Sequence, residues 1–590
     1  MSWDLHESRF APMLGTNYVP SSIELDQLQV TLLDARDQLG RLTTDIARAQ
    51  AALDNLLLQE KKIKNYIHAH QALASPIRRI PSETLAEIFF QGLPSDSPYG
   101  LRSTKCAPLL LTTVCKHWRD VSIHTPRLWN SLHIHFPSSL TQVAARQRTA
   151  GLALWLDRSG TLPIAISVHG SLKTRDSDSI AKASSNMTCL LDSLWNFHDR
   201  IQHLTLALPI DDLLILEVNF PSSSPDFFPQ LTSLEVAHHH IGRAIVPAAT
   251  HPYSALLAQM PALKSLVMKT GIRGDVQYHA LPCHWVNLTN IEISVFLRSS
   301  DLLILLTSTP RLQTLKIGVK VDQDSSAEKT RIILPDATSM RLAMKPHTRD
   351  QSPDGIYMDW TCSVFSRISC PALTSLSVSW RNRTPAPKLP FLEMQIPQLK
   401  ELGLEITMTP AALTECLSML PSLVSLSLVD LGWGLTQEYG TTLQDSHLRC
   451  LCPTSVALED YLCPQLQEFR MIVCPEYRVW SQDITHWSNG ALVDFISSRA
   501  INGDPVLKTC DIFIQEKRDF SETQLGRLRA LKETGRLKIR IHHPKDHSEP
   551  EEDAPTTGIV EPVSEPRIMR DTWPSGLEDI GGEFNTTLLV

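Results

Sequence analysis

The sequence predicts an α/β protein in which a long N-terminal helix and a small helical module precede an irregular solenoid of strand–helix repeats. Three observations lead to this prediction: an uninterrupted apolar heptad, two short amphipathic segments after it, and a proline–leucine pattern that recurs through most of the remaining chain. A chain of 590 residues is too long for one compact core, so several domains or a repeat array are expected.

The long helix is expected over residues 23–73, after a flexible N-terminus over residues 1–22. A 3-4 spacing without proline places these residues on one seam: Leu25, Leu28, Leu32, Ala35, Leu39, Leu42, Ile46, Ala49, Leu53, Leu56, Glu60, Ile63, Ile67 and His70. Such a seam must be buried against another helix. Two hypotheses remain open, a homodimeric coiled coil and a helix that packs on the body of its own chain.

Two short helices are expected next, within a domain of residues 74–136. In the first, Pro81 suits an opening turn, and Leu85, Ile88 and Phe89 fall on one face. A polar loop containing prolines and glycines follows. A single second helix is then expected over residues 109–121. Its apolar stripe comprises Leu111, Val114, Cys115, Trp118 and Val121.

These segments resemble the F-box family. The shared pattern is Ile80-Pro81-Ser82-Glu83-Thr84-Leu85-Ala86-Glu87-Ile88-Phe89, then Val114-Cys115-Lys116-His117-Trp118-Arg119, then Leu128-Trp129. The order, spacing and residue types match, over less than a tenth of the chain. The long loop between the two helices is similar to the expanded loops of fungal members, as is the long helix before them.

The resemblance implies that the module binds the Skp adaptor of Skp–cullin–F-box ubiquitin ligases and, through it, a cullin. The implied adaptor contacts are Pro81, Leu85, Ile88 and Phe89 from the first helix and Val114, Cys115 and Trp118 from the second. Docking of an apolar helical stripe in a groove is the expected physics. The alternative is that the same stripe forms the module's own core, and for Trp118 this alternative is favoured.

A repeat begins beyond residue 220: an apolar residue, proline, any residue, leucine, two residues, leucine, one residue and an apolar residue. Residues 228–236 and 260–268 are its first copies, and five of the gaps between copies are 24–26 residues. Each copy pairs a strand with a helical stretch. The helical stretches are expected at residues 254–260, 301–307, 411–420 and 491–498.

A strand and a helix in each unit of this length is the leucine-rich-repeat design. The array is similar to the leucine-rich region that follows many F-boxes, but it lacks the Asn/Cys ladder position, so an irregular solenoid is expected over residues 137–544. Half-copies at residues 129–134 and 201–206 indicate that the array starts near residue 129.

The residue between the last two apolar positions of each strand should face outward on the concave side of the solenoid. The charged members of this set are Glu235, Glu292, Lys316, Arg341 and Arg470. Their signs are mixed and no aromatic residue interrupts them, whereas a nucleic-acid groove would carry a basic stripe with stacking rings. A protein substrate is therefore the expected ligand of this face.

Charge is concentrated in the C-terminal tail. Residues 545–590 hold 11 of the 63 acids and 3 of the 55 bases, which leaves 52 of each sign in the rest of the chain. A neutral body disfavours electrostatic binding of nucleic acid or an anionic membrane. The acidic tail, which also contains several prolines, is expected to be disordered.

The sequence offers no sign of targeting, metal binding or catalysis. No apolar run approaches a membrane span and no signal peptide is apparent, so an intracellular protein of the cytoplasm or nucleus is expected. Cys450, Cys452, Cys463 and Cys474 lack the close pairs of zinc sites, and Cys370 and Cys463 occupy an apolar slot of the repeat. No metal or cofactor is therefore expected.

Phosphate-binding loops, nucleophile elbows and zinc-protease motifs are absent from the sequence, so the chain is expected not to be an enzyme. The expected function is that of a substrate-recognition subunit of a ubiquitin ligase. The alternative is a non-catalytic scaffold that acts through the coiled coil and the solenoid.

Overall fold

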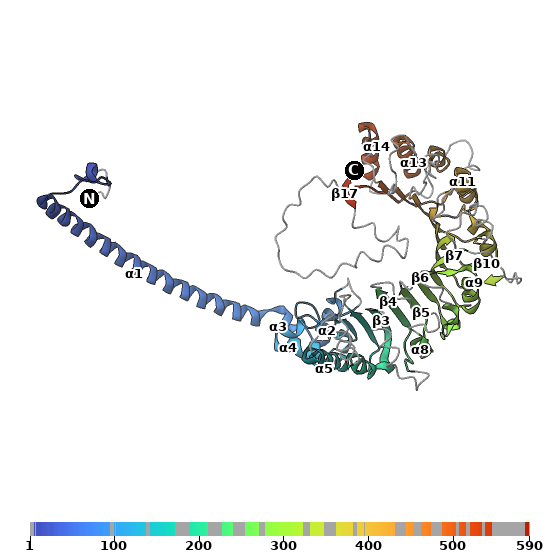
Figure 1. The fold of residues 1–590 in the computed structure, drawn as a ribbon, viewed down its shortest axis with the longest axis horizontal. Helices are drawn as coiled ribbons and strands as arrows, with labels where there is room; N and C mark the ends of the chain where they lie inside the picture. The colour runs from blue at the N-terminus through green and yellow to red at the C-terminus, as the bar shows by residue number, and fades with distance from the viewer. Residues whose placement is uncertain are drawn as a thin grey trace. The chain divides into compact units, whose positions relative to one another are not determined.

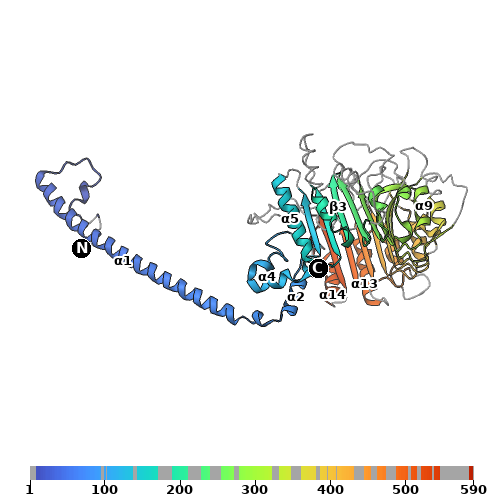
Figure 2. The same cartoon turned by 90° about the horizontal axis from the view of Figure 1, so that it is seen from below.

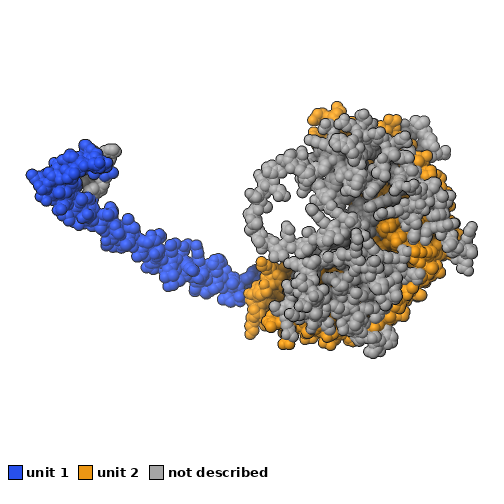
Figure 3. Space-filling view, in the orientation of Figure 1, with its two compact units in different colours: residues 1–88 blue, residues 89–590 orange. Residues whose placement is uncertain are grey.

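The computed structural model describes most of the chain. The described residues are 5, 8–94, 99–100, 102–136, 142–170, 189–209, 227–239, 254–270, 278–321, 331–346, 361–380, 386–394, 396–406, 408–430, 444–453, 462–473, 487–502, 507–514, 520–533, 537–544 and 584–588. The chain divides into two compact units, residues 1–88 and 89–590 (Figure 3). The boundary falls within the expected domain of residues 74–136 rather than at either end of it.

The first unit consists mainly of one helix, α1 (Ser22–Ala74), which confirms the long helix predicted over residues 23–73. Its start is fixed by a capping box, in which the Ser21 hydroxyl accepts from the amide of Glu24 and the Glu24 carboxylate accepts from the amide of Ser21 at 2.8 Å. The hydrogen bond from the Ser21 backbone lowers the pKa of Glu24. Short 3-10 turns lie on either side of α1, at η2 (Ala11–Met13) and η3 (Pro76–Arg79).

The prediction of a single second helix over residues 109–121 is wrong. After α2 (Ser82–Gln91) the chain forms two helices, α3 (Leu111–Val114) and α4 (Lys116–Ile123), separated by Cys115 in an extended conformation. The hydroxyl of Thr112 donates to the carbonyl of Leu109 at 2.7 Å, and Arg119 Nε donates to the carbonyl of Thr112 at 2.8 Å. In a continuous helix, the carbonyls of Leu109 and Thr112 would accept from backbone amides four residues later. Because side chains donate to them here, these bonds favour the break between α3 and α4.

The second unit is built on one large sheet. Its fifteen strands, among the described residues, are β1 (Ser131–Phe136), β2 (Ile164–Gly170), β3 (Ile201–Pro209), β4 (Ser233–His239), β5 (Ser265–Thr270), β6 (Asn290–Arg298), β7 (Thr314–Val321), β9 (Ser339–Pro346), β11 (Ser375–Trp380), β12 (Glu401–Ile406), β13 (Ser425–Asp430), β14 (Glu468–Val473), β15 (Thr509–Ile514), β16 (Lys538–Pro544) and β17 (Phe584–Leu588). They pair in this order. All neighbours are parallel except β16 and β17 (Figure 1).

Helices connect the strands on one face of the sheet. They are α5 (Gln142–Arg158), α8 (Ser254–Leu257), α9 (Ser299–Ser308), α11 (Pro410–Ser418), α12 (Asp445–Cys450), α13 (Asn489–Asn502) and α14 (Glu522–Glu533). Figure 1 shows α9, α11, α13 and α14 on the same side of the strands, and Figure 2 shows the strands side by side. The predicted helical stretches of the repeat correspond to α8, α9, α11 and α13.

Shorter elements complete the described chain. They are the 3-10 turns η4 (Pro126–Leu128), η5 (His198–Arg200), η6 (Tyr278–Ala280), η7 (Trp285–Asn287) and η8 (Pro390–Glu393), and a two-stranded pair of β8 (Ile332–Ile333) and β10 (Ile368–Ser369). No described helix is both long enough and apolar enough to cross a membrane.

The leucines of the repeat explain why each copy adopts this arrangement. In the copy that contains β5, Leu263 before the strand and Leu266 within it are both fully buried. The carbonyl of Thr232 accepts from the amides of Lys264 and Ser265, both at 2.9 Å, and the carbonyl of Lys264 accepts from the next copy in the same way. This ladder fixes the register between copies, so the same position of every repeat lies in one row.

Two strands depart from the sequence prediction. β1 begins the sheet within the domain of residues 74–136, as the half-copy at residues 129–134 indicated, whereas β2 was not predicted. β17 lies in the tail that was expected to be disordered, and pairing of its alternating sequence with β16 accounts for the difference. The rest of that tail, residues 545–583, lies outside the described residues.

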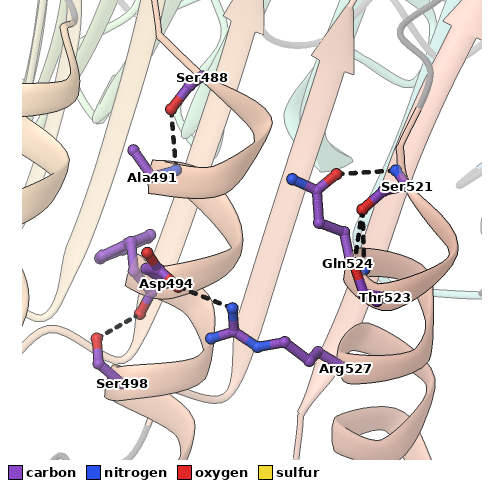
Figure 4. A network of polar contacts seen from close by, with 9 residues as sticks. Ser488, Ala491, Asp494, Ser498, Ser521, Thr523, Gln524 and Arg527 are labelled. Atoms are coloured by element: carbon purple, nitrogen blue, oxygen red, sulfur yellow. Dashed lines mark hydrogen bonds and ion pairs between the residues drawn. The ribbon is translucent and has the colours of Figure 1, made fainter.

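The helices α13 and α14 illustrate how the connections are secured (Figure 4). Asp494 of α13 and Arg527 of α14 form an ion pair at 2.8 Å. Ser521 caps α14: its hydroxyl accepts from the amide of Gln524 at 3.3 Å, and the Gln524 side chain accepts from the amide of Ser521 at 2.9 Å. The contacts lie at the surface, so they align the two helices without adding much stability.

Candidate protein-interaction site

The Leu-Trp pair at residues 128–129 anchors the second half of the helical module to the sheet. Leu128 and Trp129 are buried, and Trp129 Nε1 donates to the carbonyl of Ser122 in α4 at 2.8 Å. The Trp129 ring meets the edge of Trp155 on α5 with centroids 4.8 Å apart, and Arg158 lies over it at 4.5 Å. α4 is therefore held against the start of the sheet by aromatic packing.

Two of the seven expected adaptor contacts lie in the interior. Leu85 is 0% exposed and Phe89 is 2% exposed. The Phe89 ring packs against Trp118 with centroids 4.8 Å apart, which makes Trp118 part of the same cluster, as the alternative reading of the sequence favoured. The next residue, Phe90, lies beneath the guanidinium of Arg127 at 3.8 Å.

The other expected contacts reach the surface. Pro81 and Cys115 are exposed, Ile88 is 47% exposed and Val114 is 53% exposed. Sequence reasoning missed Leu110, which is 42% exposed, although it belongs to the same leucine run that starts the second segment. We call Ile88 of the first unit, together with Leu110, Val114 and Cys115 of the second, the exposed apolar set; the name refers to the exposure of each residue and not to a shared surface. A single isolated apolar side chain at a surface is ordinary.

The break between α3 and α4 determines how this motif presents its residues. The Cys115 backbone is extended, and its sulfur accepts from the amide of Trp118 at 3.4 Å, so that it caps α4. Because the two helices are not continuous, Val114 is the last residue of α3 and Trp118 lies in the first turn of α4. The predicted stripe therefore divides into an exposed part at Val114 and Cys115 and a half-buried part at Trp118.

A second candidate surface is a row of side chains that crosses the whole parallel sheet. The register of the strands aligns His133, Ser167, Thr205, Glu235, Val267, Glu292, Lys316, Arg341, Ser377, Gly403, Ser427, Arg470, Asp511 and Arg540. We call this the central row. All five charged residues proposed from the sequence lie in it, which confirms their common position. From His133 to Asp511, the residues on both sides of each member are buried apolar side chains, so the row faces away from the helices.

Most charges of the central row are paired across strands. Glu292 and Lys316 are 2.9 Å apart, and Asp511 and Arg540 are 2.6 Å apart. Glu235 pairs instead with Lys269, two residues further along the neighbouring strand, at 3.0 Å. Opposite charges on adjacent strands stabilise the register modestly, and they leave a face of mixed sign.

Partial burial changes the pKa of two members of the central row, Arg470 and His133. Burial lowers the pKa of Arg470, whose guanidinium lies over the Phe513 ring at 5.2 Å. At the other end, burial is also the main cause that lowers the pKa of His133. The first three members of the row were missed because the repeat pattern is clear only beyond residue 220, although the half-copies indicated two of those strands.

A compact contact next to the row involves Phe296, Gly318 and Lys345. The Phe296 ring lies over Gly318, where an added Cβ would meet ring atoms at 3.0 Å, and Lys345 Nζ lies 3.7 Å from the ring centroid. Arg298, Lys320 and Lys345 are aligned by the strand register. Alternation along the strands could have identified this contact, because Gly318 and Lys320 follow Lys316 of the central row at steps of two residues.

The cysteines of the repeat behave as buried apolar residues. Cys370 and Cys463 are 0% and 1% exposed, and burial raises the pKa of both thiols to about 12. Cys474 lies outside the described residues. Within the described part of the chain, no group of three or more His, Cys, Asp or Glu residues is arranged to hold a metal ion.

No protein-family model matches the chain, and no curated protein matches it either.

Proposed function

We propose that this chain is a substrate-recognition subunit of a Skp–cullin–F-box ubiquitin ligase. The observation that supports it best is the exposure of Ile88, Val114 and Cys115, which occupy positions of the F-box-like motif, while Leu85, Phe89 and Trp129 of the same motif are buried. Exposed apolar residues in such helices are the kind of side chain that docks in the groove of a partner. The chain itself would carry out no chemistry, because the other subunits of such a ligase supply it.

The remaining part of the proposal concerns the substrate. We take the repeats to form a leucine-rich-repeat-like solenoid, and the central row to be the surface that binds a protein substrate. The parallel strand order and the constant register support this assignment. Mixed charges along the row favour a protein segment with both signs over a uniformly acidic ligand.

A scaffold without ubiquitin-ligase function is the second candidate. It is favoured by α1, in which no residue is buried although ten Leu and Ile residues lie on one seam. A scaffold would use α1 and the sheet, and it would not depend on the exposed apolar set.

Adaptor binding separates the two candidates. We expect the full chain to bind a purified Skp adaptor in isothermal titration calorimetry, and Ile88→Asp with Val114→Asp to weaken binding at least about 100-fold, because each change places a carboxylate in an apolar contact. Leu85 and Phe89 are unsuitable for this test, since they are buried and their substitution would unfold the module.

The matched control is Met419→Asp, which introduces the same charge at a side chain that is 55% exposed at the end of α11. It should bind the adaptor like the unchanged chain. A folded chain that does not bind the adaptor at about 50 μM, or a double variant that binds normally, would contradict the proposal and favour the scaffold.

A further inference from the structure

Most of the seam of α1 is exposed, and only Leu28 and Ala35 are half-buried. All of α1 is described and none of its residues is buried. The exposed fractions of Leu39, Ile46 and Leu56 are 65%, 67% and 63%. A helix of 53 residues extends about 80 Å. An apolar stripe of that length at heptad spacing fits another helix of similar length.

Three further features of the seam constrain its partner. Ala35 and Ala49 are small, and Glu60 places a carboxylate among the apolar residues. A parallel pair of α1 helices would set Glu60 against Glu60 and each alanine against itself. That arrangement brings like charges together in the seam and leaves two thin layers.

An antiparallel pair avoids these conflicts over the full length of the helix. The layers would be Leu25–His70, Leu28–Ile67, Leu32–Ile63, Ala35–Glu60, Leu39–Leu56, Leu42–Leu53 and Ile46–Ala49, each formed twice. Every alanine then faces a larger side chain, and Glu60 faces Ala35 next to the cation of Arg36 from the second copy. No layer contains two like charges.

The charges of α1 also favour this direction. Residues 22–39 carry four acids and one base, residues 40–56 carry two of each, and residues 57–74 carry one acid and three bases. An antiparallel pair sets the acidic end of each helix beside the basic end of the other, whereas a parallel pair sets like ends together. Among the helices that the structure describes, α1 itself supplies this complement over its full length.

We infer that α1 forms an antiparallel two-stranded coiled coil with α1 of a second copy of this chain, with Leu28 of each copy packed against Ile67 of the other. This inference is independent of the proposed ubiquitin-ligase function. Each dimer would carry two copies of the sheet, and it could engage two sites on one partner.

The direction can be tested on the full chain with a photo-reactive benzoylphenylalanine in place of Gln29, which borders the seam. Irradiation followed by mass spectrometry should join residue 29 of one copy to peptides containing residues 63–70 of the other. Crosslinks between the two residue-29 regions would show a parallel pair and overturn the inference, as would the absence of any crosslink between copies.

Sedimentation of the full chain from about 1 to about 50 μM tests the seam itself. Leu39→Asp with Ile46→Asp should raise the dimer dissociation constant at least about 100-fold. Val30→Asp with Leu58→Asp, at two apolar residues outside the seam that are 68% and 52% exposed, should leave it within about threefold. A monomeric unchanged chain, or a dimer that survives the seam variant, would overturn the inference.

Discussion

A single buried polar residue is expected to contribute more to the free energy of unfolding of this chain than any of its surface ion pairs. Arg499 is 0% exposed and donates to the carbonyls of Leu451, Leu462 and Cys463 at 2.7, 2.9 and 2.9 Å. Cys463 has a φ of 49°, an uncommon conformation outside glycine. The guanidinium thus satisfies carbonyls that the loop before β14 cannot pair by itself.

Arg499→Leu should lower the free energy of unfolding by about 2–4 kcal/mol, because it leaves three buried carbonyls without their donor. Arg499→Lys should restore only part of this loss, since one ammonium cannot span three acceptors. Urea denaturation measures the effect. Arg527→Leu, which removes an exposed arginine paired with Asp494, serves as the control and should cost less than about 1 kcal/mol. Equal costs for the two leucine variants would contradict this role for Arg499.

The histidines at the start of the sheet should make stability depend on pH. Burial lowers the pKa values of His133, His135 and His203, so the unfolded chain binds protons more readily than the folded one. Their contribution is fully present above the ordinary histidine pKa of about 6.5, and it is lost as pH falls through the lowered values. Thermal unfolding from about pH 8 to about pH 5 should show a falling midpoint.

His133→Gln with His203→Gln should flatten that dependence, because glutamine keeps a polar group but does not titrate. His117→Gln, at an exposed residue of α4, is the control and should leave the slope unchanged. An identical slope in the His133 and His203 variant would show that other groups govern the effect.

At the scale of elements, the repeat could be predicted because it depends on one-dimensional spacing. Leu231, Leu263 and Leu423 recur with proline two residues before them, and all three are fully buried. The break at Cys115 could not be predicted in the same way. It depends on Arg119 reaching the carbonyl of Thr112, a contact seven residues apart that periodicity does not encode.

The sequence identified the segments of the candidate protein-interaction site, but it did not predict which of their side chains are buried. The F-box-like motif identifies residues 80–89 and 114–119, yet a helical stripe alone does not tell which of its members face the interior. The helical pattern places Leu85, Ile88 and Phe89 on one face. Only the structure shows that Leu85 and Phe89 are buried while Ile88 is exposed. The central row was predicted better, because alternation along a strand assigns a face to each residue.

The pairing of β6 with β7 depends on a glycine. Gly318→Ala should destabilise the second unit by about 1–3 kcal/mol, because its Cβ would lie 3.0 Å from the Phe296 ring and 3.1 Å from the carbonyl of Val295. Gly403→Ala is the matched control, since there the nearest atom is the hydroxyl of Ser377, which can rotate. The free energy of unfolding in urea measures both.

Combining Gly318→Ala with Phe296→Ala should cost less than the sum of the two single changes, because the smaller side chain removes the clash with the ring. Additive costs would place the strain on the backbone contact with Val295 instead.

At the scale of the whole molecule, separate roles are proposed for the long helix, the helical module and the large parallel sheet. The acidic tail holds the entire formal imbalance of charge, so the parts that carry the candidate surfaces are neutral in sum. The proposed recognition therefore relies on individual exposed side chains: apolar residues on the seam of α1 and in the exposed apolar set, and charges of both signs along the central row.

Hydrogen–deuterium exchange of the full chain with and without the Skp adaptor tests the central claim most directly. If the helical module binds the adaptor as proposed, the adaptor protects amides within residues 82–91 and 111–123 and leaves those of β4 to β7 unchanged, because the proposal assigns the sheet to a substrate. Protection confined to the sheet or to α1, or no protection at adaptor concentrations that saturate known F-box modules, would contradict it.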